Sequence, residues 1–376
     1  MTLRYAIVGS GMMGQEHIRN IALLPDAKVT AIVEPDAAMR AGSVGLVSEL
    51  FGALPRTYGS IGELHDVDAV VVALPNDLHL AALEDLSAMP VAILCEKPFG
   101  ISSVQAQRMV EIADARSHPV WVAMEYRYMP PVERLIEHVH ADRSGCLAML
   151  SIREHRFPFL GKVGHWNRFT ARTGGTLVEK CCHHFDLMRL LVRAEPVRVF
   201  ASGAMDLNHR DERYEGATPD IIDNAFVVVD FANGVRASLD LCMFAEGARW
   251  QEIVTATCTD GQAAALVPGP ARFDPDGRER AAEFRITHRT TKFEERFPTE
   301  IDPAVLRAGD HHGSTFFQHQ RFAAIVRSGG TPEVGVRDGA IAVAMGEAAQ
   351  DSIREGRAVD LPERLAPFTR KELIDG

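Results

Sequence analysis

The first third of the chain carries short apolar runs, separated by longer stretches in which apolar residues recur at helical spacing. The runs are rich in β-branched residues and lie at residues 5–8, 29–33, 69–74, 91–95 and 120–124. The helical stretches lie at residues 15–24, 78–86 and 103–115. Short runs without polar alternation are typical of strands covered on both faces. This strand–helix alternation predicts a doubly wound parallel sheet of the Rossmann type.

The pattern changes after about residue 125, where the apolar runs lengthen and alternate with polar residues. The expected strands are residues 147–157, 197–204, 225–231, 235–243 and 251–259, with hairpin turn signals at Asn233-Gly234, Asp260-Gly261 and Asp276-Gly277. Helical spacing returns at residues 314–327 and 338–355. We therefore expect an α/β domain over residues 1–124. An α+β domain over residues 125–376 should contain a mostly antiparallel, open-faced sheet and C-terminal helices, with a crossing back to the first domain possible.

Length and charge narrow the class of protein. The 376 residues suggest two domains, and 40 basic against 51 acidic residues give a formal charge of −11. This balance argues against nucleic acid or an anionic membrane surface as the main partner. The chain has no run of membrane-spanning length, lacks the long apolar stretch of a signal peptide and has no paired cysteine framework. We expect a cytoplasmic protein.

A glycine-rich turn follows the first expected strand and opens the first expected helix. Its sequence G-S-G-M-M-G begins at Gly9, which would allow a tight turn. Gly11 would let the backbone approach a pyrophosphate, and Gly14 would let the helix pack close to the strand. The N–H groups at the helix start, around Met12 and Met13, would meet the phosphates. The alternative is a tight strand–helix turn without a ligand.

Glu34 ends the second expected strand, 20 residues after Gly14. A carboxylate at this place can accept hydrogen bonds from an adenosine ribose and repels a 2′-phosphate. We therefore expect NAD in preference to NADP. Two alternatives stay open: Glu34 is an ordinary surface residue, or the nearby Arg40 binds a phosphate.

Lys97 follows the fourth apolar run, at the edge of a parallel sheet where ligands bind. Its ammonium group can hold a substrate hydroxyl and stabilise a developing alkoxide, and burial is expected to lower its pKa. The alternative is a solvated lysine that pairs with Glu96.

A second cluster lies on the expected helix after Gly174-Gly175. At about 100° per residue, Glu179, His183 and Asp186 share one face, and apolar residues occupy the other. Glu179 and His183 are four residues apart, so a hydrogen bond between them would set the ring tautomer. The alternative is a plain amphipathic helix with a solvated polar face.

The same segment contains potential metal ligands. These are Cys181, Cys182, His183, His184 and Asp186. A helix directs the cysteines and His183 away from one another, and no second ligand cluster of suitable spacing is evident, although His311-His312 could contribute. We expect no metal.

Four segments together resemble the Gfo/Idh/MocA family, which includes glucose–fructose oxidoreductase and inositol dehydrogenase. They are the glycine turn, L-P-N-D-L-H from Leu74, C-E-K-P-F-G from Cys95, and the segment from Gly174 to Asp186. The resemblance implies that Lys97 lies beside nicotinamide and substrate, and that His183 is the acid/base. It also implies that Glu179 supports His183, where the family usually has aspartate. Further cofactor contacts are expected from Leu74, Pro75, Asn76, His79 and Glu96.

A substrate cleft is expected near the domain junction. Arg127, in the sequence E-Y-R-Y, and Trp166 and Arg168, in H-W-N-R, could line a sugar-sized site, because indoles stack on sugar rings and arginine binds hydroxyls. The alternative is packing at the junction.

The expected function is NAD(P)-dependent hydride transfer between a ring carbinol of a sugar, inositol or related polyol and nicotinamide. Lys97, Glu179 and His183 would carry the acid–base chemistry and also contact the substrate. Two alternatives are an NAD-dependent glycoside hydrolase that uses transient oxidation and a non-catalytic NAD-binding regulator. An open-faced sheet also favours a homodimer or homotetramer.

Overall fold

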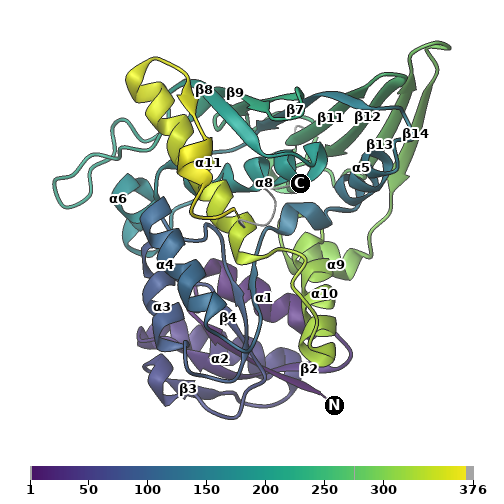
Figure 1. Ribbon diagram of the computed structural model, residues 1–376. Coiled ribbons are helices and arrows are strands. Elements are labelled where there is room, and N and C mark those ends of the chain that lie inside the picture. Colours follow the sequence, from purple (N-terminus) through teal and green to yellow (C-terminus); the bar gives the residue numbers. More distant parts are fainter. Residues whose placement is uncertain (1, 275, 370–376) are drawn as a thin grey trace.

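The computed structural model describes residues 2–274 and 276–369, and its two sheets occupy the two halves of the chain (Figure 1). The first sheet has the strand order β3-β2-β1-β4-β5-β6, and every neighbouring pair is parallel. Its strands are β1 (Leu3–Val8), β2 (Ala27–Val33), β3 (Arg56–Tyr58), β4 (Ala69–Val72), β5 (Ala92–Cys95) and β6 (Val120–Val122). The predicted doubly wound sheet is confirmed, and it also contains the short edge strand β3, which was not predicted.

Helices cover this sheet on both sides, as expected for strands that are apolar on both faces. They are α1 (Met12–Ala22), α2 (Ala37–Phe51), α3 (His79–Asp85) and α4 (Ser103–Asp114), with one-turn 3₁₀ helices η1 (Ile61–Glu63) and η2 (Asn76–Leu78). The side chain of Asp36 caps α2 by accepting a hydrogen bond from the Met39 N–H, and Ser102 caps α4 in the same way. The start of α1 has no such side-chain cap.

The second sheet has nine strands in the order β14-β13-β12-β11-β7-β10-β9-β8-β15. They are β7 (Leu147–His155), β8 (Pro196–Ala204), β9 (Asn224–Phe231), β10 (Arg236–Cys242), β11 (Glu252–Cys258), β12 (Gly261–Val267), β13 (Ala282–His288), β14 (Glu294–Thr299) and β15 (Val359–Asp360). Only the β7–β10 pair is parallel among the described strands of this sheet. The prediction of a mostly antiparallel sheet is confirmed. Asn233-Gly234 and Asp260-Gly261 form hairpin turns, whereas Asp276-Gly277 lies in the longer β12–β13 connection.

One face of this second sheet is covered by helices and the other is open (Figure 1). The covering helices are α5 (Pro130–His140), α8 (Cys182–Val192) and α11 (Val336–Glu355). On the open face, Phe200 of β8 lies opposite Val228 of β9, and the side chains of Phe226 and Met149 are also exposed. Strand alternation thus produces one buried face and one face with exposed apolar residues.

The C-terminal helices contact both halves of the molecule (Figure 1). The helices α9 (Pro303–Ala308) and α10 (Ser314–Ser328) pack against α1, whereas α11 packs against α4, α8 and β8. The short α12 (Pro362–Leu365) follows. The C-terminal segment therefore returns to the first domain, as the sequence suggested. The division at residues 124/125 stays a prediction, and its outer limits, Met1 and residues 370–376, lie outside the described residues.

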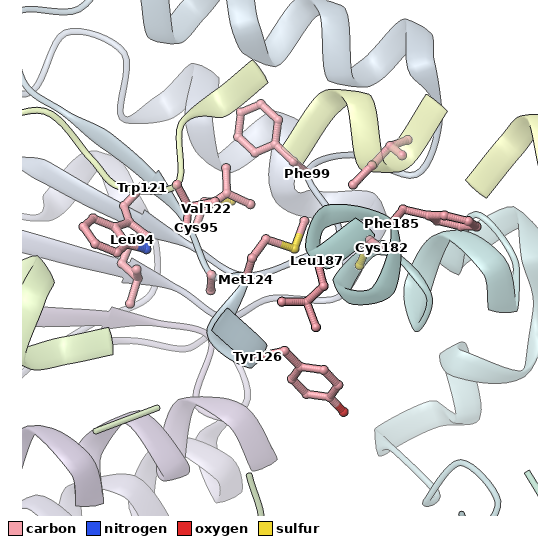
Figure 2. Packing of buried hydrophobic residues seen from close by; sticks show 14 of the residues in the cluster. Leu94, Cys95, Phe99, Trp121, Val122, Met124, Tyr126, Cys182, Phe185 and Leu187 are labelled. Atoms are coloured by element: carbon pink, nitrogen blue, oxygen red, sulfur yellow. The ribbon is translucent and has the colours of Figure 1, made fainter. Parts of the chain in front are cut away.

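A continuous apolar cluster joins the two halves (Figure 2). Leu94 and Trp121 belong to the first sheet, and Met124 lies two residues after the end of β6. Figure 2 shows Met124 beside Cys182 and Leu187 of α8, and all five side chains are fully buried. This packing holds the start of α8 against the carboxyl edge of the Rossmann sheet, where such folds bind their ligands.

Candidate active site

The glycine turn has the geometry that a dinucleotide requires. Gly9 has φ +87°, and a Cβ atom on Gly14 would lie 2.2 Å from the carbonyl oxygen of Gly9. A side chain at either position is therefore excluded. The first turn of α1, at Met12 and Met13, has no side-chain cap and no acidic residue. Its N–H groups and dipole fit a pyrophosphate, and Gly11 at the N-cap adds no Cβ beside them.

Glu34 is buried beside this turn. Its Oε2 atom accepts a hydrogen bond from the Ser10 N–H at 2.9 Å, and its Oε1 atom accepts one from the Asp36 N–H at 3.0 Å. The guanidinium of Arg40 donates to the main-chain carbonyls of Glu34 and Pro35. Oε2 also accepts a hydrogen bond from the Ser10 hydroxyl at 3.3 Å. The Glu34 carboxylate thus joins the glycine turn to the end of β2, and Oε1 retains a lone pair for a ribose hydroxyl.

The segment after β4 contacts the loop that follows Lys97 through His79. His79 is fully buried between two carbonyl oxygens, those of Leu74 at 3.1 Å and Pro98 at 3.0 Å. Burial lowers the pKa of His79 despite these two hydrogen bonds. Asn76 is buried too, whereas Leu74 and Pro75 are half-buried. Both ring nitrogens of His79 face protein carbonyls, so His79 joins the loops after β4 and β5, and this position does not favour the expected contact with the cofactor.

Glu96 is the first member of a buried hydrogen-bonded chain. Its Oε1 atom lies 2.9 Å from Nε2 of His17, and Nδ1 of His17 lies 2.8 Å from Nε2 of His319. If His17 is neutral and donates from Nε2 to the carboxylate, its Nδ1 atom accepts a hydrogen bond from the Nε2–H group of His319. The chain connects α1, the end of β5 and α10. Sequence reasoning missed both histidines because His319 is 302 residues from His17.

The Lys97 side chain reaches across to the second half of the molecule. Its Nζ atom donates a hydrogen bond to the main-chain oxygen of Glu179 at 3.1 Å. Burial lowers the pKa of Lys97, but Cys182, Glu179, Glu125 and Glu96 outweigh burial and raise it. The expectation of a lowered pKa was wrong, because the carboxylates around Lys97 stabilise its charged form.

The expected single helix around Glu179 is two helices, α7 (Thr176–Glu179) and α8. The N–H of Cys181 reaches the oxygen of Thr176 at 3.3 Å, so the turn widens between them. The described hydrogen bonds include none between the side chains of Glu179 and His183, so the predicted bond was wrong. Glu179 Oε1 lies 3.7 Å from Nζ of Lys162 instead, and Nε2 of His183 lies 3.5 Å from Oε1 of Glu125.

His183 is held between aromatic and charged neighbours. The ring of Tyr126 stacks on its imidazole with centroids 4.1 Å apart and an interplanar angle of 7°. Burial, together with the charges of Lys97 and Lys180, lowers the pKa of His183 well below its usual range. The imidazole is therefore neutral at physiological pH and can accept a proton.

Arg127 and Arg168, which were expected to contact the substrate, bind carboxylates of the protein instead. Arg127 forms a bidentate pair with Asp186, with an Nε–Oδ2 distance of 2.6 Å, and also donates to the Glu333 carbonyl. Arg168 is buried and bonds Glu212. These pairs favour the packing alternative for both arginines. Trp166 is half-buried, and its ring lies 4.4 Å from Nζ of Lys162.

A buried ionic network begins at the hydroxyl end of Tyr126. Lys180 donates to the hydroxyl of Tyr126, and its Nζ atom is 2.8 Å from Oε1 of Glu154. Glu154, His184 and Glu252 offer ligand atoms within 4.8 Å of one another, the one such group of three among the described residues. Lys180 and Arg156 both form ion pairs with Glu154, so the charge of this carboxylate is balanced by side chains of the chain. The candidate run of cysteines and histidines contributes only His184 to this group.

The fold and the glycine turn define the class as a two-domain, dinucleotide-binding protein with a site at the carboxyl edge of a Rossmann sheet. Residues 3–124 match the description "Oxidoreductase family, NAD-binding Rossmann fold". Residues 137–361 match "Oxidoreductase family, C-terminal alpha/beta domain". The chain belongs to the Gfo/Idh/MocA family of oxidoreductases.

Individual relatives are distant. The rhizopine catabolism protein MocA of Rhizobium meliloti is 29% identical over 193 residues, which are 51% of this chain and 58% of MocA, less than two thirds of its length. An inositol 2-dehydrogenase of Rhizobium meliloti (strain 1021) is 26% identical over 237 residues, 63% of this chain and 68% of the relative. The structure of a myo-inositol dehydrogenase from Corynebacterium glutamicum shares the fold, with a TM-score of 0.71 and 22% identity over 96% of this chain and 99% of that one.

The part of the chain that the structure describes contains no helix with the length and apolar content needed to cross a bilayer.

The pH dependence of stability follows from an ion pair between the C-terminal segment and α1. Nδ1 of His311 lies 2.9 Å from Oε1 of Glu16. Burial lowers the pKa of His311, but Glu16 outweighs it and raises the pKa from 6.5 to about 9. A raised pKa stabilises the fold fully below pH 6.5, and this stabilisation is lost as the pH rises through 9.

We predict that the free energy of unfolding falls by up to about 3 kcal/mol from this pair as the pH rises through that window. Denaturant titrations at several pH values would measure it. His311→Gln should remove this part of the pH dependence, and His65→Gln, at an exposed histidine, should keep it. Equal pH profiles for wild type and His311→Gln would contradict the assignment.

Proposed function

We propose that the protein is an NAD-dependent dehydrogenase that acts on a ring carbinol of a sugar, inositol or related polyol. The observation that carries the proposal is the meeting of Lys97 and His183 in one buried cluster at the carboxyl edge of the NAD-binding domain. The Lys97 charge is near enough to contribute to the lowered pKa of His183, and both residues lie near Glu125. The names of the relatives MocA and inositol 2-dehydrogenase support this class of substrate.

The residues of the first domain suit the cofactor. The N–H groups around Met12 and Met13 would hold the pyrophosphate above the glycine turn, and Glu34 would accept from the adenosine ribose. Leu74, Pro75, Asn76 and Glu96, which come from the ends of β4 and β5, would contact the nicotinamide half. NAD⁺ would supply the acceptor for the hydride that leaves the carbinol carbon.

The remaining steps are carried out by the chain itself. The Lys97 ammonium would hold the substrate hydroxyl and stabilise the developing negative charge on oxygen. The neutral imidazole of His183 would take the hydroxyl proton. The main-chain oxygen of Glu179 accepts a hydrogen bond from Lys97 and would hold the ammonium group in place. The carboxylate of Glu179, together with Lys162 and Trp166, would contact the hydroxyls of the sugar ring. Ketone reduction would use the same groups in reverse.

The direct test measures NADH formation with a panel of inositols, aldoses, sugar acids and amino sugars. With the best substrate, Lys97→Met should lower kcat at least about 100-fold because charge stabilisation at the oxygen is lost, while the Kd for NAD changes little. Lys28→Met, at an exposed lysine of β2, is the matched control. Cleaved sugar without net NADH would indicate the hydrolase alternative, and NAD binding without turnover of any substrate would indicate a regulator. Unchanged turnover in Lys97→Met would refute the role of Lys97.

The cofactor preference tests Glu34 separately. Wild type should have a higher kcat/KM with NAD than with NADP, because a buried carboxylate repels a 2′-phosphate. Glu34→Ser should shift the ratio toward NADP by about tenfold or more, the equivalent of about 1.4 kcal/mol. Glu49→Ser, at an exposed carboxylate of α2, should leave the ratio unchanged. A wild type that prefers NADP would remove Glu34 from this role.

We also propose that the open face of the second sheet forms the contact of a homodimer or homotetramer. Phe200 and Val228 lie opposite each other on β8 and β9, and Phe226 is two residues from Val228 on β9, so these exposed residues form a patch typical of association surfaces. Met149 is exposed on β7, beyond β10. Light scattering after size-exclusion chromatography should show an oligomer that Phe226→Lys weakens. Phe293→Lys, at an equally exposed phenylalanine beyond β13, should not weaken it. A monomeric wild type would contradict the proposal.

A further inference from the structure

Glu125 occupies a position that the motifs of the sequence did not identify. It is the first residue of η3 (Glu125–Tyr128), which begins three residues after the end of β6, and it is only 2% exposed. Its Oε1 atom lies 3.5 Å from Nε2 of His183, and its Oε2 atom is buried without a hydrogen-bond partner. A buried carboxylate with a free oxygen is costly to maintain, so a specific role for it is expected.

The carboxylate is surrounded by charged and titratable groups from three directions. Glu96 and Lys97 approach from the end of β5, Cys182 and His183 from α8, and His311 from the connection between α9 and α10. Burial raises the pKa of Glu125 to about 7, with Glu96 adding to the shift while His311 and Lys97 oppose it. Glu125 therefore changes charge near neutral pH, a few ångströms from the proposed acid/base.

Glu125, and not Glu179, is the carboxylate that faces the His183 ring. The carboxylate of Glu179 is directed to Lys162, because the turn after Glu179 is widened. Tyr126, the residue after Glu125, stacks on the imidazole and fixes the plane of the ring. The Nδ1 atom of His183 is buried and has no partner of its own.

We propose that Glu125, and not Glu179, is the positioning residue that orients His183. This inference rests on the proposed function. In the reacting complex the His183 Nε2–H donates to Glu125, where the present distance of 3.5 Å shortens to a hydrogen bond. The lone pair of Nδ1 is then directed at the substrate hydroxyl, since the hydrogen bond at one imidazole nitrogen sets the state of the other.

In the proposed step the carbinol C–H bond breaks, and its electron pair passes with the hydrogen to nicotinamide, so that NAD⁺ is reduced and the alcohol is oxidised. The hydroxyl O–H bond breaks, its proton goes to His183 Nδ1, and a C=O bond forms. The Glu125 carboxylate stabilises the imidazolium that results and does not itself receive the proton.

Two variants separate hydrogen bonding from charge. Glu125→Met removes the acceptor, whereas Glu125→Gln keeps a carbonyl oxygen and loses the charge. With ¹⁵N-labelled histidine, NMR should show a predominant Nε2–H tautomer of His183 in wild type and Glu125→Gln and a changed tautomer ratio in Glu125→Met. Glu179→Met should leave this signal unchanged. Circular dichroism and the Kd for NAD check that each variant is folded.

Kinetics with the best substrate supply the second readout. We expect kcat to fall at least about 100-fold in Glu125→Met and about tenfold in Glu125→Gln, with KM changing less than about threefold. In wild type kcat should decrease as the pH falls through about 7, where Glu125 becomes protonated. This acid limb of the pH profile should be absent in Glu125→Gln.

A tautomer change in Glu179→Met but not in Glu125→Met would overturn the inference, as would an unaltered acid limb in Glu125→Gln. If wild type oxidises no polyol, the proposed function fails, and the NMR comparison still decides whether Glu125 orients His183.

Discussion

The hydrogen bond from Lys97 Nζ to the main-chain oxygen of Glu179 joins the two halves of this molecule at the site. It crosses from the carboxyl end of a Rossmann strand to the helical segment of the second domain. The apolar cluster around Met124 and Leu187 holds these elements at a fixed separation. A main-chain acceptor also has a chemical consequence, because it binds the ammonium group without neutralising it. The charge of Lys97 is thus not cancelled by its partner, as the proposed stabilisation of an oxyanion requires.

Buried charges are balanced around this contact by groups from distant parts of the chain. Glu96 bonds His17, so the position of this carboxylate depends on the helix that follows the glycine turn. Lys180 and Glu154 form a second buried pair behind Tyr126. Because desolvated charges are costly unless paired, these networks position the site more strictly than exposed ion pairs could. The proposed acid/base histidine stays neutral in their midst, as a proton acceptor must.

Much of the fold could be predicted because local patterns determine it. Continuous β-branched runs predicted the five main strands of the first sheet, and alternating strands with Asn-Gly or Asp-Gly turns predicted β7 to β11 of the second. The short edge strand β3 and the outer strands β12 to β15 of the second sheet were not predicted. The glycine turn could be predicted from its motif, and the structure gives a steric reason for Gly9 and Gly14. Lys97 and His183 were singled out chiefly through the family resemblance, and the structure brings them together.

What could not be predicted depends on contacts between residues far apart in sequence. The helical wheel paired Glu179 with His183, but a widened turn separates them, and a wheel assumes uniform geometry. Glu125 reaches His183 only through the packing of η3 on α8. The pKa of Lys97 was predicted to fall because burial alone was considered, whereas the carboxylates that raise it come from three separate segments.

The central claim is that the nicotinamide ring lies between Lys97 and His183, one from each half of the molecule. A crystal structure of the protein with NAD⁺ and a polyol found by the substrate panel would test it most directly. The account predicts the nicotinamide C4 atom and the carbinol carbon in contact, with the carbinol oxygen within hydrogen-bond distance of Lys97 Nζ and the His183 imidazole. A dinucleotide bound away from the glycine turn, or a polyol that contacts neither side chain, would contradict it.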